Sequence, residues 1–319
     1  MRQIGRLVCV FLIALTAGSY RPAVAVSVKT AIQNKTASGV LHGTLTQPAG
    51  RRKSDIVIIQ PGSGASDRNG NFPGGRNNSL LLLADGLADR GIATLRFDKR
   101  AIGESRAALS NENALRFETY VADLKSWARM ATNRPDIGRL FLAGHSQGAL
   151  VATLAAEGLD VAGLILLAPV AVPASRLILW QTTHSSIRST EKTKVGQILG
   201  ALEKGHLYPN PPRTLYGLFR PSIQPYLISW FRYDPAAELR KLRVPTLIVH
   251  GTTDLQVPIR QATQLATAGR HVIQVNITGM NHILKDAPPD RRQNFRTYNT
   301  PDRSLTGGLI TVIATFIRG

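Results

Sequence analysis

The residues best suited to covalent chemistry are Gly144, Ser146 and Gly148, which belong to a Gly-His-Ser-Gln-Gly pentapeptide. The pentapeptide follows an apolar run and precedes a helix-forming run, 149–157. A Gly-x-Ser-x-Gly sequence between a strand and a helix predicts a sharp turn that lifts the serine hydroxyl above a sheet. The first helical amide, that of Gln147, would then be free to hold an oxyanion. Without a base nearby, the same five residues would be an ordinary turn before a helix.

A serine nucleophile needs a histidine base, and the histidine needs an acid to orient it. Asp254 comes soon after the buried-strand run 244–250, and His282 comes soon after a second strand-like run, 271–277. The chain order Ser, Asp, His is the one that accompanies this kind of serine turn. Because the carboxyl ends of parallel strands meet at one edge of a sheet, we predict that Ser146, Asp254 and His282 form a catalytic triad.

With these residues in place, the chain resembles the α/β-hydrolase family, and within it a group of bacterial esterases that carry a Gly-Ser-Gly-Pro-x-Asp-Arg-Asp-Gly loop. Residues 62–70 have the sequence Gly-Ser-Gly-Ala-Ser-Asp-Arg-Asn-Gly, and the resemblance extends over roughly residues 39–319. Ala65, Asn69 and Ala101 differ from the residues usual in the group. None of these departures touches the predicted triad, so they concern the rigidity of the loop and the choice of substrate.

The resemblance implies a second oxyanion donor in this loop. We expect the backbone amide of Ser63 to fill that role, with the amide of Gly64 as the alternative. The flanking glycines would let the backbone approach a substrate closely. The loop could instead be a plain glycine-rich turn. A phosphate-binding loop is not expected, because no Gly-Lys-Ser or Gly-Lys-Thr stands ahead of the next helix.

The elements that must position these residues alternate along the chain. Apolar runs predict an N-terminal β-hairpin and further strands, and helix-compatible runs lie between the later ones. Strands are expected at 26–33, 40–47, 55–60, 92–97, 139–144, 161–168, 244–250 and 271–277, and helices at 78–90, 113–131, 147–157, 259–268 and 305–317. This alternation predicts an α/β fold with a mostly parallel central sheet and helices on both faces.

Residues 173–235 interrupt the alternation and are too many for an ordinary loop. The resemblance implies a helical cap over the active site at this position. The aromatic residues of the segment could line an acyl pocket or form a small core of the cap itself. The segment holds three acidic and eight basic residues. This balance suits neutral or anionic ester substrates better than the protonated amine of an aminopeptidase substrate.

Four further polar residues lie near the predicted site in the sequence. Asp98 and Arg100 follow the strand at 92–97 and are expected to brace the site through ion pairs or loop hydrogen bonds. His145 and His250 are expected to fill structural positions beside it. No group of residues in the sequence has zinc-ligand spacing, so neither a metal nor a cofactor is predicted.

The first residues of the chain are typical of an export signal. Arg2 and Arg6 precede a short apolar segment, and 23–25 is an Ala-Val-Ala cleavage site. The segment is shorter than the about 20 apolar residues of a membrane-spanning helix. We therefore expect a signal peptide at 1–25 and a periplasmic or secreted catalytic domain at 26–319, with an uncleaved membrane anchor as the alternative. Cleavage would remove Cys9, the only cysteine.

The chain is strongly basic, with 39 Lys+Arg, 20 Asp+Glu and a net charge of +19. Removal of residues 1–25 would take away three arginines and no acid and leave +16. Such a charge favours association with anionic surfaces of the cell envelope, although it could also serve only solubility. Nucleic acid is not expected as a partner, because the basic residues are scattered and lack interleaved aromatic residues.

These features predict an exported serine carboxylesterase that cleaves short to medium acyl esters, its small-molecule substrates, through an acyl-enzyme on Ser146. A serine peptidase of the aminopeptidase kind and an acyltransferase are the alternatives within the same chemistry. A non-catalytic binding protein that keeps the fold is the alternative from another class.

Overall fold

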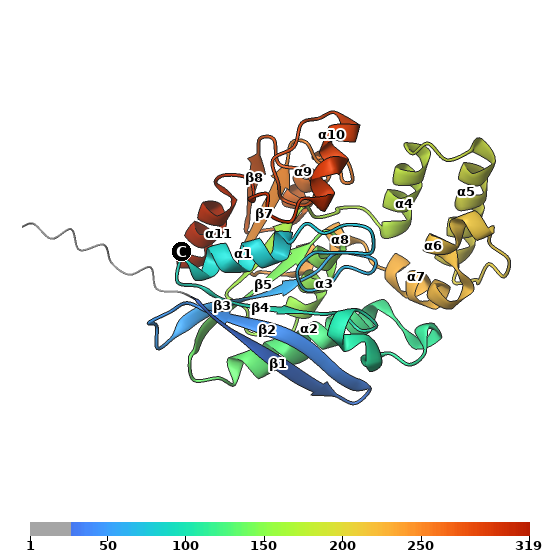
Figure 1. The fold of residues 1–319 in the computed structure, drawn as a ribbon. Helices are drawn as coiled ribbons and strands as arrows, with labels where there is room; N and C mark the ends of the chain where they lie inside the picture. Colours follow the sequence, from blue (N-terminus) through green and yellow to red (C-terminus); the bar gives the residue numbers. More distant parts are fainter. Residues whose placement is uncertain (1–26) are drawn as a thin grey trace, which may run out of the picture.

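A central sheet of eight strands organises residues 27–319, the part of the chain that the computed structural model describes (Figure 1). The strands are β1 (Val28–Thr36), β2 (Gly39–Gln47), β3 (Ser54–Gln60), β4 (Ala93–Phe97), β5 (Ile137–His145), β6 (Gly163–Leu167), β7 (Thr246–Gly251) and β8 (Val272–Ile277). They lie in the order β1-β2-β4-β3-β5-β6-β7-β8. β1 pairs antiparallel with β2, and β2 pairs antiparallel with β4, whereas all other neighbours are parallel. The predicted α/β fold is therefore confirmed. The predicted signal peptide and Cys9 lie outside the described residues.

Helices fill the connections between the parallel strands. Those that flank the sheet are α1 (Ser79–Ala88), α2 (Phe117–Thr132), α3 (Gln147–Ala156), α8 (Pro235–Lys241), α9 (Arg260–Ala268) and α11 (Leu309–Arg318), and α10 (Arg291–Arg296) lies in the last long connection. Short 3₁₀ helices occur at Gly103–Ala108, Glu112–Ala114, Arg213–Leu215, Pro221–Ile223 and Thr297–Asn299. The sequence did not predict α8 and α10, which are each shorter than two full turns. Within residues 27–319, we find no helix with the length and apolar character needed to span a membrane.

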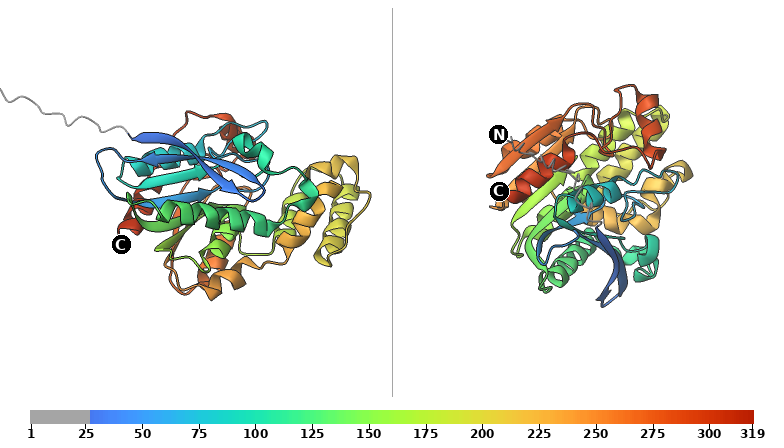
Figure 2. Two further views of the ribbon diagram at one scale, coloured as in Figure 1. Left: turned by 90° about the horizontal axis from the view of Figure 1, so that it is seen from below. Right: turned by 60° about the vertical axis from the view of Figure 1, so that its left-hand side comes forward.

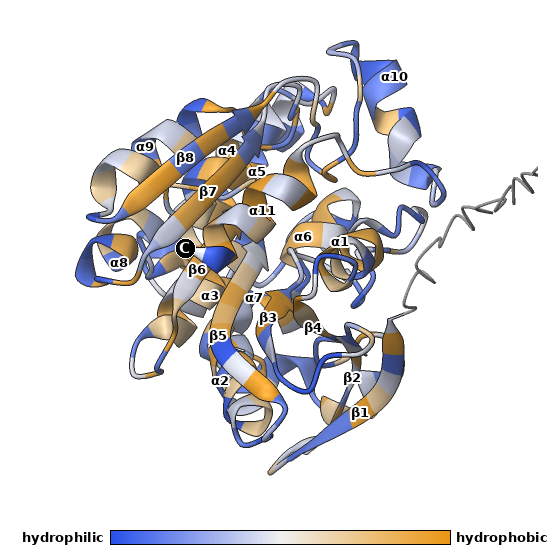
Figure 3. Cartoon of the chain, turned by 90° about the vertical axis from the view of Figure 1, so that its left-hand side faces the viewer, coloured by the Kyte–Doolittle hydropathy of each residue, from blue (hydrophilic) through white to orange (hydrophobic). Residues whose placement is uncertain are grey.

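Alternating side chains of the strands supply two separate cores, one on each face of the sheet. On β3, Ile56 and Ile58 pack into the core that contains α2, α3, α8 and α9, with Trp127 fully buried at its centre. Val57 and Ile59 point to the opposite face and pack against α1 and α11. This is the two-residue periodicity of a strand buried on both faces. Figure 3 shows the strands β7 and β8 mostly in the hydrophobic colour.

Residues 173–235, here called the cap segment, form a group of helices at one end of the molecule (Figures 1 and 2). They comprise α4 (Ala174–Thr183), α5 (Ser189–Glu203), α6 (Tyr216–Phe219) and α7 (Gln224–Phe231). The helix-compatible run around 175–204 is two helices, because the chain turns at 184–188. Phe117 at the start of α2 stacks on Trp230 of α7, with ring centroids 5.7 Å apart, so the cap segment packs directly on the sheet-flanking helices.

The carboxyl edge of the parallel strands collects the loops that the sequence analysis singled out. The loop at 61–78 follows β3, Ser146 follows β5, Asp254 follows β7 and His282 follows β8. The cap segment leaves the sheet after β6 and returns before β7. Because β6 lies between β5 and β7, the segment emerges beside the nucleophile turn.

Candidate active site

A strained turn presents Ser146 at the end of β5. Its backbone has φ 54° and ψ −120°, a conformation that a non-glycine residue adopts only when its surroundings impose it. Two close backbone approaches impose it here. A Cβ on Gly144 would lie 2.1 Å from the carbonyl oxygen of Gly148, and a Cβ on Gly148 would lie 2.5 Å from that of Gln60. Both glycines are therefore needed for the turn to close.

The turn also prepares an oxyanion site. Gln147 is the first residue of α3, so its backbone amide has no carbonyl one turn earlier in the helix. The loop after β3 passes close to the same point. A Cβ on Gly62 would lie 3.4 Å from Ser146 Cβ, and the next residue, Ser63, lines the cavity walls together with Ser146. The structure thus brings both predicted oxyanion donors to the nucleophile.

A buried lysine that the sequence analysis missed holds this loop. Lys99 Nζ donates to the carbonyl oxygen of Gly62 and, at 2.8 Å, to that of Gly64. The side chain is 1% exposed, its ammonium lies 5.6 Å from the ring centroid of Tyr120, and it has no ion-pair partner within residues 27–319. Burial lowers the pKa of Lys99 from 10.5 to about 7. A strand-end lysine in a polar Asp-Lys-Arg stretch gives no local sign of such burial.

The residues on either side of Lys99 brace the surrounding loops, as the sequence predicted. Asp98 accepts from the backbone amide of Arg68 at 2.8 Å and from its guanidinium at 2.6 Å. Arg100 forms a buried bidentate pair with Asp123 on α2, at 2.6 and 2.7 Å. The first interaction ties the loop 62–70 to β4, and the second ties β4 to α2. Neither residue contacts the cavity wall formed by His282.

The histidine and the acid of the predicted triad are hydrogen-bonded. His282 Nδ1 donates to Asp254 Oδ2 at 2.7 Å, and the other carboxylate oxygen accepts from the amides of Gln256 and Val257 at 2.8 and 2.9 Å. The Asp254 side chain is fully buried. Burial would raise the pKa of Asp254, but the attraction of His282 and these hydrogen bonds hold the pKa below its usual value. The carboxylate therefore keeps the proton on Nδ1 and leaves Nε2 free to act as a base.

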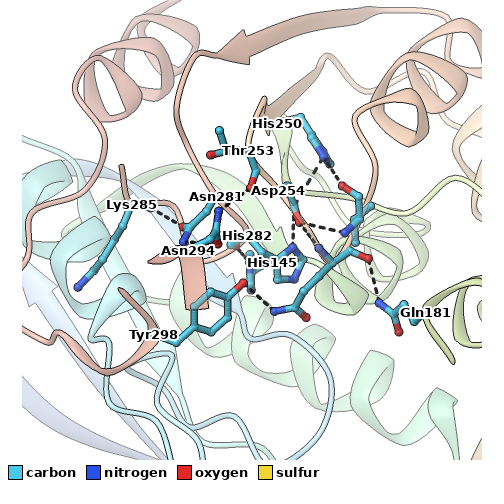
Figure 4. Close-up of polar contacts among 12 residues, drawn as sticks. His145, Gln181, His250, Thr253, Asp254, Asn281, His282, Lys285, Asn294 and Tyr298 are labelled. Carbon is cyan, nitrogen blue, oxygen red and sulfur yellow. Dashed lines mark hydrogen bonds and ion pairs between the residues drawn. The ribbon is translucent and has the colours of Figure 1, made fainter. Parts of the chain in front are cut away.

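Gln256 extends this hydrogen-bond network in two directions, toward Tyr298 and toward Gln181, both of which are labelled in Figure 4. Its side-chain amide donates to the hydroxyl of Tyr298 at 2.9 Å, and its backbone carbonyl accepts from Gln181 of α4 at 3.0 Å. The loop that carries Asp254 is thus attached both to the C-terminal region and to the cap segment. No local pattern in the sequence indicates this role, because Gln181 and Tyr298 are far from Gln256 along the chain.

His145 and His250 occupy structural positions, as predicted. Burial lowers the pKa of His145 to about 3, so the ring is neutral at physiological pH and its Nε2 donates to the carbonyl oxygen of His282 at 2.7 Å. Burial also lowers the pKa of His250, whose Nε2 donates to the carbonyl oxygen of Val257 at 2.9 Å. His145 therefore fixes the backbone of the predicted base, and His250 closes the Asp254 loop.

Asn281 anchors the loop that carries His282. Its side-chain amide donates to Thr297 Oγ1 at 2.8 Å, and its side-chain oxygen accepts from the amide of Lys285 at 3.1 Å. Asn294 adds a hydrogen bond from α10 to the carbonyl oxygen of Thr253, beside Asp254. The Gly-Met-Asn-His stretch includes Asn281, but only the folded chain places α10 and residues 297–300 against it.

Ser146 and His282 line the same cavity, which has a volume of about 720 Å³. No hydrogen bond joins the two side chains among the contacts of residues 27–319. Catalytic pairs of this kind often tighten only when a substrate is bound. A second cavity of about 430 Å³ reaches Ser146 from beneath the cap segment. Ser146, His282 and Ser63 thus line one accessible cavity, with Asp254 buried behind His282 and Gln147 next to Ser146, and this is the set of groups that acyl transfer through a serine requires.

Comparison with known proteins places the chain among serine hydrolases. Residues 78–283 match the family described as serine aminopeptidase, S33, and this range includes Ser146, Asp254 and His282. The chain is 27% identical to the esterase EstD of Thermotoga maritima over 248 residues. That alignment covers 76% of this chain but only 58% of the length of EstD.

Solved structures share the fold at low sequence identity. Est1E from Butyrivibrio proteoclasticus with ferulic acid bound is 17% identical, with a TM-score of 0.59 over 90% of this chain and 96% of that one. The Pyrococcus furiosus esterase Pf2001 is 14% identical, with a TM-score of 0.56 over 92% of each chain. At these identities the similarity establishes the α/β-hydrolase architecture.

The three triad side chains should differ in their contribution to catalysis. Ser146→Ala should stay folded and lose fluorophosphonate labelling together with hydrolysis, because no covalent intermediate can form. His282→Ala should lower kcat by roughly 10⁴-fold or more, and Asp254→Asn should lose somewhat less, because the acid orients the base without touching the substrate. Labelling with an active-site phosphonate and steady-state kinetics measure these effects. Folded His145→Ala and His250→Ala proteins are the controls, and a greater loss in either than in His282→Ala would show that the base is assigned wrongly.

The buried ammonium of Lys99 should give the protein a characteristic pH dependence of stability. Since the pKa is about 7 in the folded protein and 10.5 ordinarily, the unfolded chain binds more protons between these values. The free energy of unfolding contributed by Lys99 therefore rises with pH above about 7. Urea unfolding between about pH 6 and pH 9 should show this rise in the native protein relative to Lys99→Met. Lys99→Arg, which stays charged, should not show it. Parallel pH profiles of the native protein and Lys99→Met would contradict the assignment.

Proposed function

The chain belongs to the serine aminopeptidase S33 family of α/β-hydrolases, and from that premise we propose that it is a serine carboxylesterase that cleaves short to medium acyl esters. The names of similar proteins support an ester rather than a peptide substrate, since both EstD and Est1E are described as esterases. The family description alone would favour an aminopeptidase. The charges of the two cavities decide between these activities.

The observation that carries the proposal is the lack of a free carboxylate in the walls of the two cavities, as far as residues 27–319 form them. No Asp or Glu lines the larger cavity. Glu112 is the acidic residue of the smaller one. Arg220 donates to both of its carboxylate oxygens, to Oε2 at 2.8 Å, and Ser222 also donates to Oε2. The hydrogen bond from Arg220 lowers the pKa of Glu112, which stays charged and neutralised. A protonated substrate amine would therefore find no counter-charge.

The geometry supports a two-step acyl transfer. His282 Nε2 takes the proton of Ser146 Oγ as that oxygen attacks the ester carbonyl, and Asp254 stabilises the imidazolium that forms. The amides of Ser63 and Gln147 hold the oxyanion of the tetrahedral intermediate. His282 then gives its proton to the departing alcohol, which leaves an acyl group on Ser146. In the second step His282 activates a water molecule that releases the acid.

We also propose that the cap segment covers the acyl-binding region and forms part of the catalytic domain 26–319. Two hydrogen bonds support this role. Gln147 of the nucleophile turn donates to the hydroxyl of Tyr226 on α7 at 2.7 Å, and Gln181 of α4 donates to the Asp254 loop at 3.0 Å. Leu177 and Leu227 of the segment line the smaller cavity beside Ser146.

Matched substrates distinguish an esterase from an aminopeptidase-like enzyme. We expect the ethyl ester of N-acetylalanine to be cleaved faster than that of free alanine, because the site offers no partner for the ammonium group. We also expect 4-nitrophenyl butyrate to exceed alanine 4-nitroanilide by about 10³-fold or more in kcat/KM. Steady-state hydrolysis measures both ratios. A preference for the free amine would overturn the proposal in favour of a peptidase. Predominant transfer of the acyl group to an added alcohol would identify an acyltransferase. Active-site labelling without hydrolysis of any substrate would indicate a non-catalytic binding protein.

For location, we propose export with cleavage after Ala25 and association of the mature protein with anionic surfaces of the cell envelope. The support comes from the sequence of residues 1–25 and from the charge of +16 that remains. The intact mass of the protein from its host should correspond to a chain that begins at Val26 and lacks cysteine. Envelope-bound protein should be released by salt, because screening weakens such attraction. Retention of residues 1–25 in the membrane fraction would indicate an anchor instead, and a cytoplasmic full-length chain would rule out export.

A further inference from the structure

Two cavities of different character meet at Ser146. They share the loop residues Ser63, Gly64 and Ala65, the nucleophile Ser146, and the bridging residues Gln181 and Gln256. Beyond this junction their walls separate. The nucleophile therefore has one binding space on each side, and an ester has two parts to place in them.

The position of His282 distinguishes the two spaces. His282 and its neighbour Ile283 line the larger cavity and are not part of the wall of the smaller one. Gln147, whose amide is a proposed oxyanion donor, lines only the smaller cavity. Ser63, the other proposed donor, lines both cavities, so of these groups only the base is confined to the larger cavity.

The chemistry of the first step assigns the leaving group. As the bond between Ser146 Oγ and the carbonyl carbon forms, the bond from that carbon to the alcohol oxygen breaks. The proton taken from Ser146 passes through His282 Nε2 to the departing oxygen, so this oxygen must lie within reach of His282. The alcohol part of the substrate then projects into the larger cavity, and the acyl chain has only the smaller cavity to occupy.

The smaller cavity suits an unbranched aliphatic chain. Its wall is formed mainly by aliphatic side chains, among them Leu109, Leu150, Leu177, Ile178 and Leu227, and is completed by the aromatic residues Tyr120, Tyr226 and Trp230. The charges on its wall are already satisfied. Glu112 pairs with Arg220, Arg100 pairs with Asp123, and Lys99 donates to the loop carbonyls. An acyl group without charge gains most from this surface, because each methylene that leaves water for an apolar wall strengthens binding.

The larger cavity suits a flat ring. Phe72, Trp180, Phe295 and Tyr298 line it, together with backbone of the glycine-rich loop. Aromatic walls of this kind favour a planar group that can stack or meet them edge to face.

We propose that the enzyme prefers esters that join an uncharged aliphatic acid, bound in the smaller cavity, to an aromatic alcohol, bound in the larger one beside His282. This assignment rests on the proposed esterase function. Water completes the reaction by attacking the acyl group on Ser146 from the space that the alcohol has vacated. The attack restores the serine hydroxyl and releases the aliphatic acid.

The test uses two exposed wall residues, one from each cavity. Leu218 lines only the smaller cavity and is 46% exposed, and Phe72 lines only the larger one and is 38% exposed, so substitutions at both should leave the fold intact. We measure two ratios of kcat/KM in each variant. The first compares 4-nitrophenyl dodecanoate with the butyrate, and the second compares phenyl butyrate with ethyl butyrate.

Leu218→Trp should lower the chain-length ratio about tenfold and leave the aryl-to-ethyl ratio within about twofold of the native value. Phe72→Ala should lower the aryl-to-ethyl ratio about fivefold and leave the chain-length ratio unchanged within about twofold. Ile178→Trp narrows the smaller cavity more deeply and repeats the first test. The assignment would be overturned if each variant changed the ratio expected of the other, or if one variant changed both ratios. It would also be overturned if neither Leu218→Trp nor Ile178→Trp changed the chain-length ratio. If the native enzyme hydrolyses none of the esters, the proposed function itself fails.

Discussion

The structure of the site depends on how closely three backbone segments approach one another at Ser146. β5, the start of α3 and the end of β3 meet where only Gly144 and Gly148 fit, and the contact holds Ser146 at φ 54°. A non-glycine residue in that region carries a cost of about 1–3 kcal/mol, which the surrounding packing must offset. The two cores on the faces of the sheet supply this packing. The serine therefore stands in one orientation before any substrate arrives, and the amide of Gln147 is directed by the same turn.

The other parts of the site are held by polar groups buried around this turn. Lys99 fixes the carbonyl oxygens of the loop after β3, and His145 fixes the backbone of His282. Both groups are less basic than usual because they are buried, so their hydrogen bonds do not depend on a neighbouring carboxylate. Asp254, by contrast, is charged and accepts hydrogen bonds on both oxygens. Negative charge is thus concentrated behind the base, where it stabilises the imidazolium.

Local sequence patterns were sufficient to predict the sheet, the flanking helices other than α8, and the loops of the triad. Apolar alternation and strand-to-helix spacing depend on neighbours along the chain, and these positioned Ser146, Asp254 and His282 at one edge. Lys99, Gln256 and Asn281 act through partners distant in sequence, so only the folded chain reveals their roles. α10 escaped prediction for a related reason, since Asn294 within its six residues bonds to Thr253 in the distant loop that carries Asp254. The cap segment could be delimited by length, but the turn at 184–188 that divides the run into α4 and α5 could not.

The core on the α2 side of the sheet does not end at the catalytic domain proper. Val195, Ile198 and Leu199 of α5, together with Leu227 of α7, belong to the same cluster as Trp127 of α2. The apolar core of the cap segment is therefore continuous with the core on this face of the sheet, and we expect the two to unfold together. A cap grafted from a relative would need the matching apolar face of α2 as well. Without it, apolar side chains of α2 that pack against the native cap would be exposed to water.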